Sequence, residues 1–261
     1  MDKIAIMVAA HKPYWMPEDQ SMYLPLQVGA AGKDSIGWQR DDQGENISEK
    51  NQTFCELTGQ YWAWKNIDAD FFGLCHYRRY FGTPYFWKTK KNRILKQSKA
   101  QGLLAKSDLL LPKKRHYWIE TNQSQYEHAH HAIDLATAKQ IIQECCPEYI
   151  PSLEKVMGSR SGHRFNMYVM RRNVFFAYSQ WLFSILFILE RRLDISGYTA
   201  NDKRVFGFVA ERLLDVWIEH HQIRYIECSV INLESQKWGK KIVSFFRRKF
   251  VRRCKPSGGS T

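Results

Sequence analysis

Residues 41–81 run DDQGENISEKNQTFCELTGQYWAWKNIDADFFGLCHYRRYF. The pattern predicts a polar loop, a helix, a short turn at Asp68-Ala-Asp70, a buried strand over residues 71–75 and a cationic loop. Polar residues that directly follow a buried strand lie at its carboxyl end, which is where open α/β sheets bind ligands. The stretch therefore predicts an α/β fold with a ligand site after residue 75.

The cationic loop begins with His76, Tyr77, Arg78 and Arg79. Guanidinium groups close to a buried strand are costly unless they meet anions, and their forked donors match phosphate oxygens in pairs. These residues are therefore candidates for binding a phosphorylated ligand. An equally good interpretation is a solvated loop whose arginines pair with nearby acids such as Asp68 and Asp70.

The rest of the chain also alternates apolar runs with polar loops. Short runs predict strands at residues 4–10, 108–112, 166–170 and 223–228. Longer segments predict helices at residues 125–145 and 198–217, and a packing helix at residues 175–193. A length of 261 residues and a hydrophobic content of 44% suit one large α/β domain. The small-residue loop at 24–32 is neither GxGxxG nor a P-loop, which excludes the familiar dinucleotide and ATP motifs.

Several blocks, spread in order over roughly residues 4–218, resemble a bacterial domain family found in capsule and O-antigen gene clusters. The blocks are AAHKPY, LPLQVGAAG, DDxGxNISEKN, CELTxxYWAWKN, DADFFGLCHYRRYF, QYxxAHHxxDL, HRFNMYVM and YxxxxKRVFGFVAERLLxxW. Characterised members of that family are galactofuranosyltransferases. The resemblance implies a nucleotide-sugar-dependent glycosyltransferase with a GT-A-like α/β fold, a mixed sheet flanked by helices, over residues 1–235.

The resemblance also implies a donor site. In such folds the nucleotide enters after the first strand, where His11 and Lys12 stand to meet a diphosphate. An acid after the second strand holds the base or ribose, and Asp42 is the candidate. Lys50 and Asn51 open the following helix, whose N-terminus attracts anions. The plainer interpretation is that these are surface residues and that Asp42 is simply a residue type that favours turns.

Many GT-A enzymes carry an Asp-x-Asp metal motif just after the central strand. Here Asp68-Ala-Asp70 precedes that strand, and the place of the motif is taken by residues 76–79. The charge of a leaving diphosphate must be offset by a metal ion or by fixed cations. We therefore expect Arg78 and Arg79 to replace the metal. The alternative is Mn²⁺ or Mg²⁺ bound with help from His76.

Two further blocks predict the acceptor side. Tyr126, His131 and Asp134 fall in one block, and we expect either acceptor contacts or structural hydrogen bonds from them. In related folds the start of the strand at 166–170 lines the acceptor cleft. His163, Arg164 and Asn166 are the candidates there.

An inverting transfer needs a carboxylate that takes the proton of the acceptor hydroxyl. GT-A enzymes usually supply it late in the chain. Glu211 is the first candidate and Asp202 the second. An ion pair with Arg204 or Arg212 is at least as good an explanation for either acid.

The net charge of +13 is concentrated in the tail. Residues 237–255 contain nine of the 39 Lys and Arg residues and no acid, so the remainder carries +4. Aromatic and aliphatic residues alternate with these cations, which predicts an amphipathic helix on an anionic membrane surface within the tail at 236–261. Nucleic-acid binding is the competing interpretation, which we do not favour.

Six cysteines occur, and none is in a CxxC pair. With no secretory signal recognised, their usage predicts free thiols in a reducing compartment. No apolar run reaches 18 residues, so we expect no membrane span. The predicted location is the cytoplasm, peripheral on the inner face of the cell membrane.

Together these features predict transfer of a hexose from a nucleoside-diphosphate sugar, with UDP-galactofuranose and inversion as the leading expectations. The predicted acceptor is a lipid-linked capsule or O-antigen glycan. Galactopyranose or rhamnose is the nearest alternative donor sugar. A noncatalytic sugar- or nucleotide-binding component of a glycan assembly complex is the alternative from another functional class.

Overall fold

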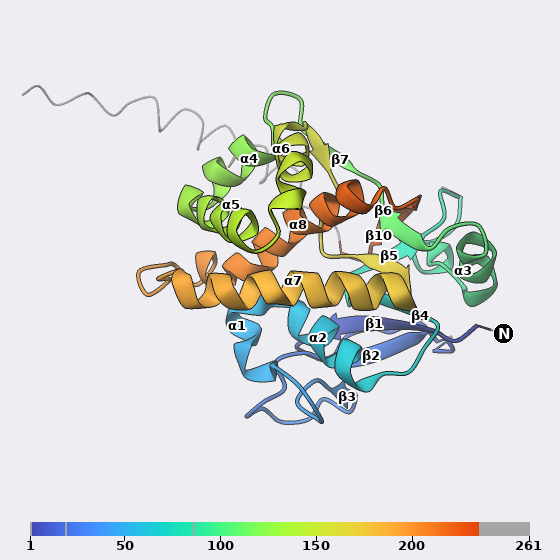
Figure 1. Cartoon of the computed structure of the whole chain (residues 1–261). Coiled ribbons are helices and arrows are strands. Elements are labelled where there is room, and N and C mark those ends of the chain that lie inside the picture. The colour runs from blue at the N-terminus through green and yellow to red at the C-terminus, as the bar shows by residue number, and fades with distance from the viewer. Residues whose placement is uncertain (1, 19, 86, 235–261) are drawn as a thin grey trace, which may run out of the picture.

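The computed structural model describes residues 2–18, 20–85 and 87–234 (Figure 1). The tail helix predicted within residues 236–261 lies outside these ranges, so it stays a prediction. Within the described chain, one large mixed sheet is flanked by helices, as the sequence predicts.

Eight strands of the described chain form this sheet in the order β3-β2-β1-β4-β5-β10-β6-β9, and β4 also pairs with β9. Their bounds are β1 (Ile4–Ala10), β2 (Tyr23–Gln27), β3 (Gln39–Arg40), β4 (Phe71–His76), β5 (Arg79–Gly82), β6 (Leu109–Pro112), β9 (Tyr168–Arg171) and β10 (Ile226–Asn232). The first four strands are parallel, and β9 runs antiparallel between β4 and β6. The pairs β4–β9, β9–β6, β6–β10, β10–β5 and β5–β4 therefore close into a ring.

A separate two-stranded ribbon pairs β7 (Arg115–His116) with β8 (Ser161–Gly162). The helices of the described chain are α1 (Asn51–Phe54), α2 (Leu57–Asn66), α3 (Gln97–Leu104), α4 (Asn122–Ala129), α5 (Ala132–Cys145), α6 (Ile150–Gly158), α7 (Arg172–Arg192) and α8 (Val205–His221). Short 3₁₀ turns are η1 (Ser48–Lys50), η2 (Lys91–Arg93), η3 (Pro147–Tyr149) and η4 (Asp202–Arg204).

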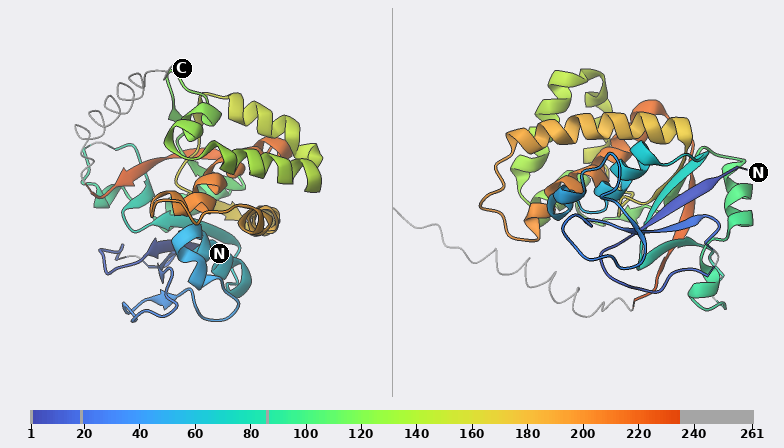
Figure 2. Two further views of the ribbon diagram at one scale, coloured as in Figure 1. Left: turned by 90° about the vertical axis from the view of Figure 1, so that its left-hand side faces the viewer. Right: turned by 90° about the horizontal axis from the view of Figure 1, so that it is seen from below.

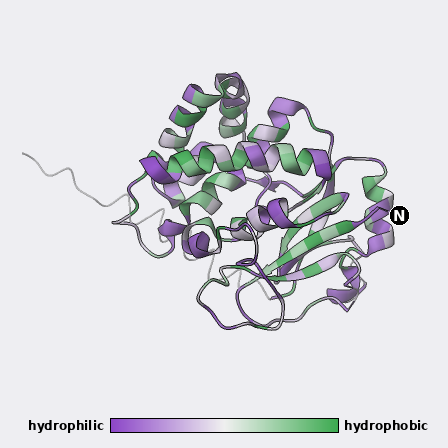
Figure 3. Ribbon diagram, turned by 60° about the horizontal axis from the view of Figure 1, so that its bottom comes forward, coloured by the Kyte–Doolittle hydropathy of each residue, from purple (hydrophilic) through white to green (hydrophobic). Residues whose placement is uncertain are grey.

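The two faces of the sheet build two hydrophobic cores. Phe72 and Leu74 belong to the core that includes α2, α7 and α8, whereas Phe71 and Cys75 belong to the core that includes α3. This alternation within one strand follows from the two-residue period of β structure. Figure 2 shows helices on both sides of the strands. Both faces of β4 are covered, which explains its uninterrupted apolar sequence. Figure 3 shows the same strands as largely hydrophobic beneath helices with one polar face.

Helix α7 is the packing helix predicted at residues 175–193. Its 21 residues are long and apolar enough to cross a membrane by length and composition alone. Half of its most apolar window is buried inside the protein, where Phe175 stacks on Phe72 at 4.5 Å and Leu182 and Leu186 are buried. That burial is typical of the core helix of a globular domain.

Four local predictions are wrong. The helix expected at residues 198–217 begins only at Val205, after the 3₁₀ turn η4. The helix expected at residues 125–145 breaks at the extended residue His130 into α4 and α5. The helix of the opening stretch breaks at Cys55, whose φ of 54° is stabilised by Asn51 Nδ2 donating to the Cys55 carbonyl at 2.6 Å. The cationic loop is a tight turn, because Arg79 already begins β5.

Candidate functional site

Four segments distant in sequence meet at one edge of the sheet. Ala9 of β1 pairs with His76 of β4, and Leu74 of β4 pairs with Tyr168 at the start of antiparallel β9. The residues that follow β1 and β4 therefore lie beside those that precede β9. The N-terminal half of α8 completes the group, because Gly207 accepts a hydrogen bond from Asn166 at 3.1 Å.

The first part of the site is a cationic cluster around Tyr77. His11 meets the Tyr77 ring edge-on at 5.4 Å, the Arg78 guanidinium lies 4.9 Å over it and the Lys12 ammonium 6.0 Å from it. Burial lowers the pKa of His11, and the neighbouring charges of Lys12 and Arg78, and more weakly those of Lys33 and Arg204, lower it further. Several positive charges thus converge near one point. Concentrated fixed cations are what a nucleotide's diphosphate requires.

Arg79 connects this cluster to two carboxylates. Its guanidinium stacks 4.6 Å over the ring of Phe165. Burial and then the charge of Arg78 lower the pKa of Arg79, whereas the charges of Glu211 and Glu56 oppose that shift. Arg79 therefore lies between the cations and the acids.

The first carboxylate, Glu56, is held from two directions. Asn166 Nδ2 donates to Glu56 Oε1 at 2.8 Å, and His76 Nε2 lies 4.0 Å from the same oxygen. His76 Nε2 donates to the Phe165 carbonyl at 2.6 Å, which fixes the orientation of the imidazole. The Glu56 side chain keeps 10% of its surface exposed. It is therefore ordered and still accessible.

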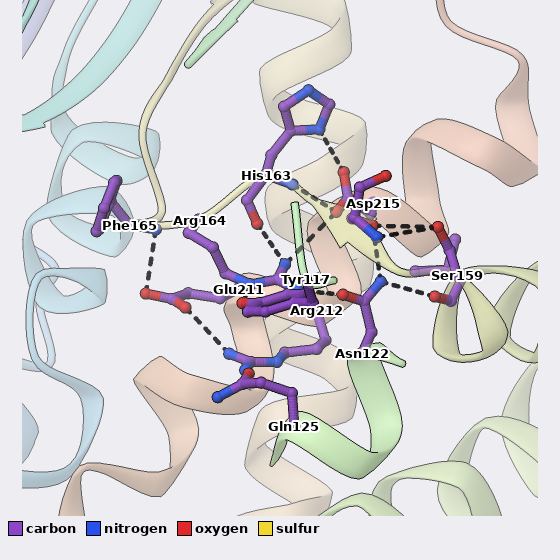
Figure 4. Close-up of polar contacts among 12 residues, drawn as sticks. Tyr117, Asn122, Gln125, Ser159, His163, Arg164, Phe165, Glu211, Arg212 and Asp215 are labelled. Atoms are coloured by element: carbon purple, nitrogen blue, oxygen red, sulfur yellow. Dashed lines mark hydrogen bonds and ion pairs between the residues drawn. The ribbon is translucent and has the colours of Figure 1, made fainter. Parts of the chain in front are cut away.

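The second carboxylate, Glu211, is oriented by two donors (Figure 4). The backbone N–H of Phe165 donates to Oε1 at 3.1 Å, and Arg212 Nη1 donates to Oε2 at 3.0 Å. Arg212 is buried and is itself held by Gln125 Oε1 at 2.6 Å and by the Tyr126 ring at 5.1 Å. Helix α4 thus positions Glu211 through Arg212.

Backbone strain gathers at the same place. Cys55, Phe165 and Asn166 have φ values of 54°, 80° and 48°, a region that residues other than glycine rarely adopt. Arg204 Nε lies 3.2 Å from Cys55 Sγ, and burial raises the pKa of that thiol to about 12. Strain of this kind persists only where the surroundings enforce it, and it is concentrated at functional sites.

Of the predicted donor residues, the structure brings together His11, Lys12 and residues 76–79. The acids named as alternative partners of the arginines are engaged elsewhere. Asp68 pairs with Arg172, and Asp70 accepts from the backbone of Lys3 at 2.8 Å. Arg78 instead pairs with Glu234 at 2.9 Å, and both side chains of that pair are well exposed.

The structure does not bring Asp42, Lys50 or Asn51 into the cluster. Asp42 pairs with Arg40 at 2.6 Å, and this hydrogen bond lowers the pKa of Asp42. Lys50 pairs with Glu190 at 2.7 Å. Asn51 supports the turn at Cys55. These geometries favour the structural interpretation, and donor contacts from the three residues remain predictions.

The neighbouring Asp41 organises the loop instead. It is fully buried and accepts from the backbone N–H groups of Gly29 and Ala30, at 2.9 and 3.0 Å, and from the hydroxyls of Ser48 and Thr58, at 2.5 and 2.6 Å. Gly29 adopts φ +60°, and a Cβ there would lie 2.5 Å from Asn51. The small-residue loop is therefore needed for this close approach.

Among the predicted acceptor residues, Tyr126 and Asp134 form a buried hydrogen bond of 2.8 Å, and Tyr198 donates to Asp134 at 2.7 Å. His163 and Arg164 are buried around Asp215, with His163 Nδ1 2.5 Å from its carboxylate and Arg164 Nη1 at 3.7 Å (Figure 4). This favours structural hydrogen bonds over acceptor contacts for these four residues, and the acceptor role stays a prediction.

His131 and Asp202 face each other on the exposed side. His131 stacks on Tyr198 at 4.0 Å, and its Nε2 lies 3.7 Å from Asp202. Asp202 also accepts from Thr199 at 2.7 Å, a bond that lowers the pKa of Asp202. The structure therefore groups Asp202 with the histidines, apart from the pair formed by Glu56 and Glu211.

Glu56 and Phe165 are absent from the site residues predicted from the sequence, and Arg204 appears there only as an ion-pair partner. Glu56 lies in the CELT block, but a single acid beside an aromatic helix face carries no distinguishing pattern. Phe165 acts through its backbone groups, and the identity of a side chain does not predict such a role. All three lie in the sequence blocks that carry the family resemblance, which is the signal that could have identified them.

A cavity of about 200 Å³ lies apart from the cationic cluster. It is lined by the buried His163, by Lys114 and Tyr225, and by Asp215 and Glu219 of α8. We place the chemistry at the cationic edge instead, because the cations, the carboxylates and the strained backbone coincide there. Among the residues that the structure describes, no three His, Cys, Asp or Glu side chains are grouped to hold a metal.

Comparisons with known proteins agree with this architecture. The family model described as a domain of unknown function, DUF4422, matches residues 5–222. A structure described as the apo form of the WbbM bifunctional glycosyltransferase is similar with a TM-score of 0.81 and 31% identity. The match covers 90% of this chain and 46% of that one, so this chain spans about half its length. No curated protein matches. Because the family model covers most of the chain, the protein belongs to the DUF4422 family.

Proposed function

We propose that this protein is a glycosyltransferase that moves a hexose from a nucleoside-diphosphate sugar to a glycan acceptor, on a GT-A-like scaffold. The observation that carries the proposal is the juxtaposition of cations around Tyr77 with two accessible carboxylates at one sheet edge. The similarity to a bifunctional glycosyltransferase supports it. UDP-galactofuranose is the leading donor, and galactopyranose or rhamnose the nearest alternative sugar.

In this mechanism the diphosphate occupies the cationic cluster. Arg78, Arg79 and Lys12 offset the charge that the leaving UDP acquires as its bond to the anomeric carbon breaks. The electron pair of that bond leaves with the UDP. Arg204 adds its charge from the start of α8. Mn²⁺ or Mg²⁺ remains the alternative neutraliser, with His76 as a protein ligand.

Glu211 acts as the general base. The acceptor hydroxyl attacks the anomeric carbon from the face opposite the UDP, its proton passes to Glu211, and the configuration inverts. The N–H of Phe165 and the guanidinium of Arg212 orient the carboxylate. Glu56 is the second candidate, because its charge also raises the pKa of Arg79 and its side chain keeps 10% of its surface exposed. Asp202 becomes the third, because its contacts are with the histidines.

The acceptor we propose is a lipid-linked capsule or O-antigen glycan, handled by a peripheral protein on the inner membrane face. This part rests on the family resemblance and on the tail at residues 237–255, not on the described residues. The second functional candidate is a noncatalytic sugar-nucleotide-binding component. Arg78 and Arg79 would serve that function equally well.

A donor screen that measures release of the donor's nucleoside diphosphate tests the proposal. Purified protein is mixed with UDP-galactofuranose, UDP-galactose and a nucleotide-activated rhamnose, with and without a glycan acceptor. Each reaction is run with EDTA and with Mn²⁺. We expect release that depends on one donor and on acceptor, and persists in EDTA. Tight UDP binding without turnover would favour the noncatalytic function. Activity that is lost in EDTA and restored only by Mn²⁺ would show that a metal ion, and not the arginines, offsets the charge of the diphosphate.

A further inference from the structure

Among the exposed large apolar side chains of the described chain, two are adjacent in sequence. Trp118 and Ile119, in the loop between β7 and α4, expose 92% and 72% of their surface. A large apolar side chain held in water is costly, and two in succession mark an interaction surface. Neither residue takes part in the proposed catalytic site.

The loop that presents them is anchored at both ends. Before the tip, the Tyr117 N–H donates to the Arg160 carbonyl at 2.7 Å, and its hydroxyl accepts from Arg164 at 3.0 Å. After the tip, Thr121 caps α4 through Ser124 at 3.1 Å. Trp118 and Ile119 are therefore displayed by a fixed base, so little ordering is required when they meet a partner.

Positive charge surrounds the base of this loop. Lys113, Arg115 and Arg160 are exposed, and none of them makes an ion pair with another described residue. The one acid of the loop, Glu120, is already engaged by His128 at 2.7 Å. An apolar tip above unpaired cations complements a surface with an apolar interior and an anionic boundary.

We propose that the Trp118–Ile119 tip inserts into an anionic lipid surface, with Lys113, Arg115 and Arg160 on its phosphate headgroups. Tryptophan concentrates at the boundary between headgroups and acyl chains, and each nearby cation adds attraction to anionic lipid. A glycan would use the Trp118 ring but gains nothing from Ile119, which offers neither a flat face nor a hydrogen bond. The proposal depends neither on the glycosyl transfer nor on the tail beyond residue 234.

Partition of the full chain onto vesicles tests this inference. The vesicles are phosphatidylcholine alone or mixed with phosphatidylglycerol. We expect stronger binding to the mixed vesicles, and the Trp118→Ser/Ile119→Ser double variant should partition about tenfold less, since each side chain loses its transfer from water. Ile133→Ser is the matched control for Ile119→Ser, because Ile133 is 57% exposed on α5. It should partition like the wild type.

Brominated lipids report the depth of the tryptophan itself. Quenching should be weaker in Trp118→Phe than in the wild type. This readout separates the tip from any contribution of residues 237–255, because those residues are unchanged. Equal partition of the double variant and the wild type, equal quenching in Trp118→Phe, or equal binding to both vesicle types would overturn the proposal. Circular dichroism of the double variant excludes misfolding as the cause of a loss.

Discussion

The backbone N–H of Phe165 donates to Oε1 of Glu211 at 3.1 Å, across 46 residues of sequence. Phe165 makes this bond in a left-handed conformation, with φ 80°, and its carbonyl meets His76 Nε2 at 2.6 Å. One strained residue thus connects the proposed base to the cationic turn after β4. The geometry of base and donor site is therefore coupled.

Replacing Glu211 by Gln should lower kcat by about 10²–10⁴-fold, because the proton of the acceptor hydroxyl loses its acceptor. KM for the nucleotide sugar should change little. Glu219→Gln is the matched control, since this acid lies on the same helix but pairs with Lys155 at the surface. If kcat survives Glu211→Gln and falls in Glu56→Gln, the base is Glu56.

Replacing Arg79 by Gln should weaken UDP binding, measured by calorimetry, by about tenfold or more, because a charge-assisted contact to phosphate is lost. The control is Arg171→Gln at the last residue of β9, where the guanidinium pairs with Asp108 at 2.5 Å. Equal UDP affinity of wild type and Arg79→Gln would contradict the assignment of the diphosphate to this cluster.

Asp41→Asn should destabilise the fold by about 3 kcal/mol in urea unfolding, because the new amide group faces donors in a buried site. Asp41 accepts four hydrogen bonds. Asp42→Asn is the neighbouring control, and its partly exposed pair with Arg40 should contribute at most about 1 kcal/mol. A similar cost for both variants would show that the loop does not depend on the buried carboxylate.

His130 should make stability depend on pH. Burial lowers its pKa from 6.5 to about 4, helped by the charge of Arg212, whereas Asp202 opposes the shift. Between pH 6.5 and about 4 the unfolded chain binds a proton at this residue that the folded chain does not, so stability falls as the pH falls.

His130→Gln removes that term, so its free energy of unfolding should decline less steeply over this pH window. His128→Gln is the control, because His128 is largely exposed and pairs with Glu120. Parallel pH curves for wild type and His130→Gln would contradict the prediction.

The local sequence pattern was enough to predict the strands that are buried on both sides and the helix that packs along one face. Strand β1 has the predicted bounds, β4 extends the predicted run by one residue, and α7 covers the predicted packing helix. An uninterrupted apolar run must be buried, because any other placement would expose apolar surface to water. Few other structures are therefore open to these segments. The turn at Asp68-Ala-Asp70 and the cationic residues after residue 75 could also be predicted from the sequence, since residue types alone indicate a turn or a charged segment.

The breaks at Cys55 and His130 could not be predicted in the same way. Each depends on a contact formed only after packing: Asn51 holds the strained Cys55 carbonyl, and His130 stacks on Phe208 of α8 at 4.1 Å. Helical periodicity continues through both positions in the sequence, so tertiary contacts override it.

Residue types identified Arg78, Arg79 and Glu211 as chemically capable, but each had an ion-pair explanation that no spacing could remove. The folded chain shows which ion pairs form. Asp68 and Asp70 are engaged elsewhere, whereas Arg78 pairs with Glu234 and Glu211 pairs with Arg212, as the ion-pair explanation of Glu211 predicts. The fold also brings Asn166 to Glu56 across 110 residues of sequence. A site assembled from strand ends and the start of a helix depends on long-range pairing. That pairing is set by how the sheet closes, and no single segment encodes it.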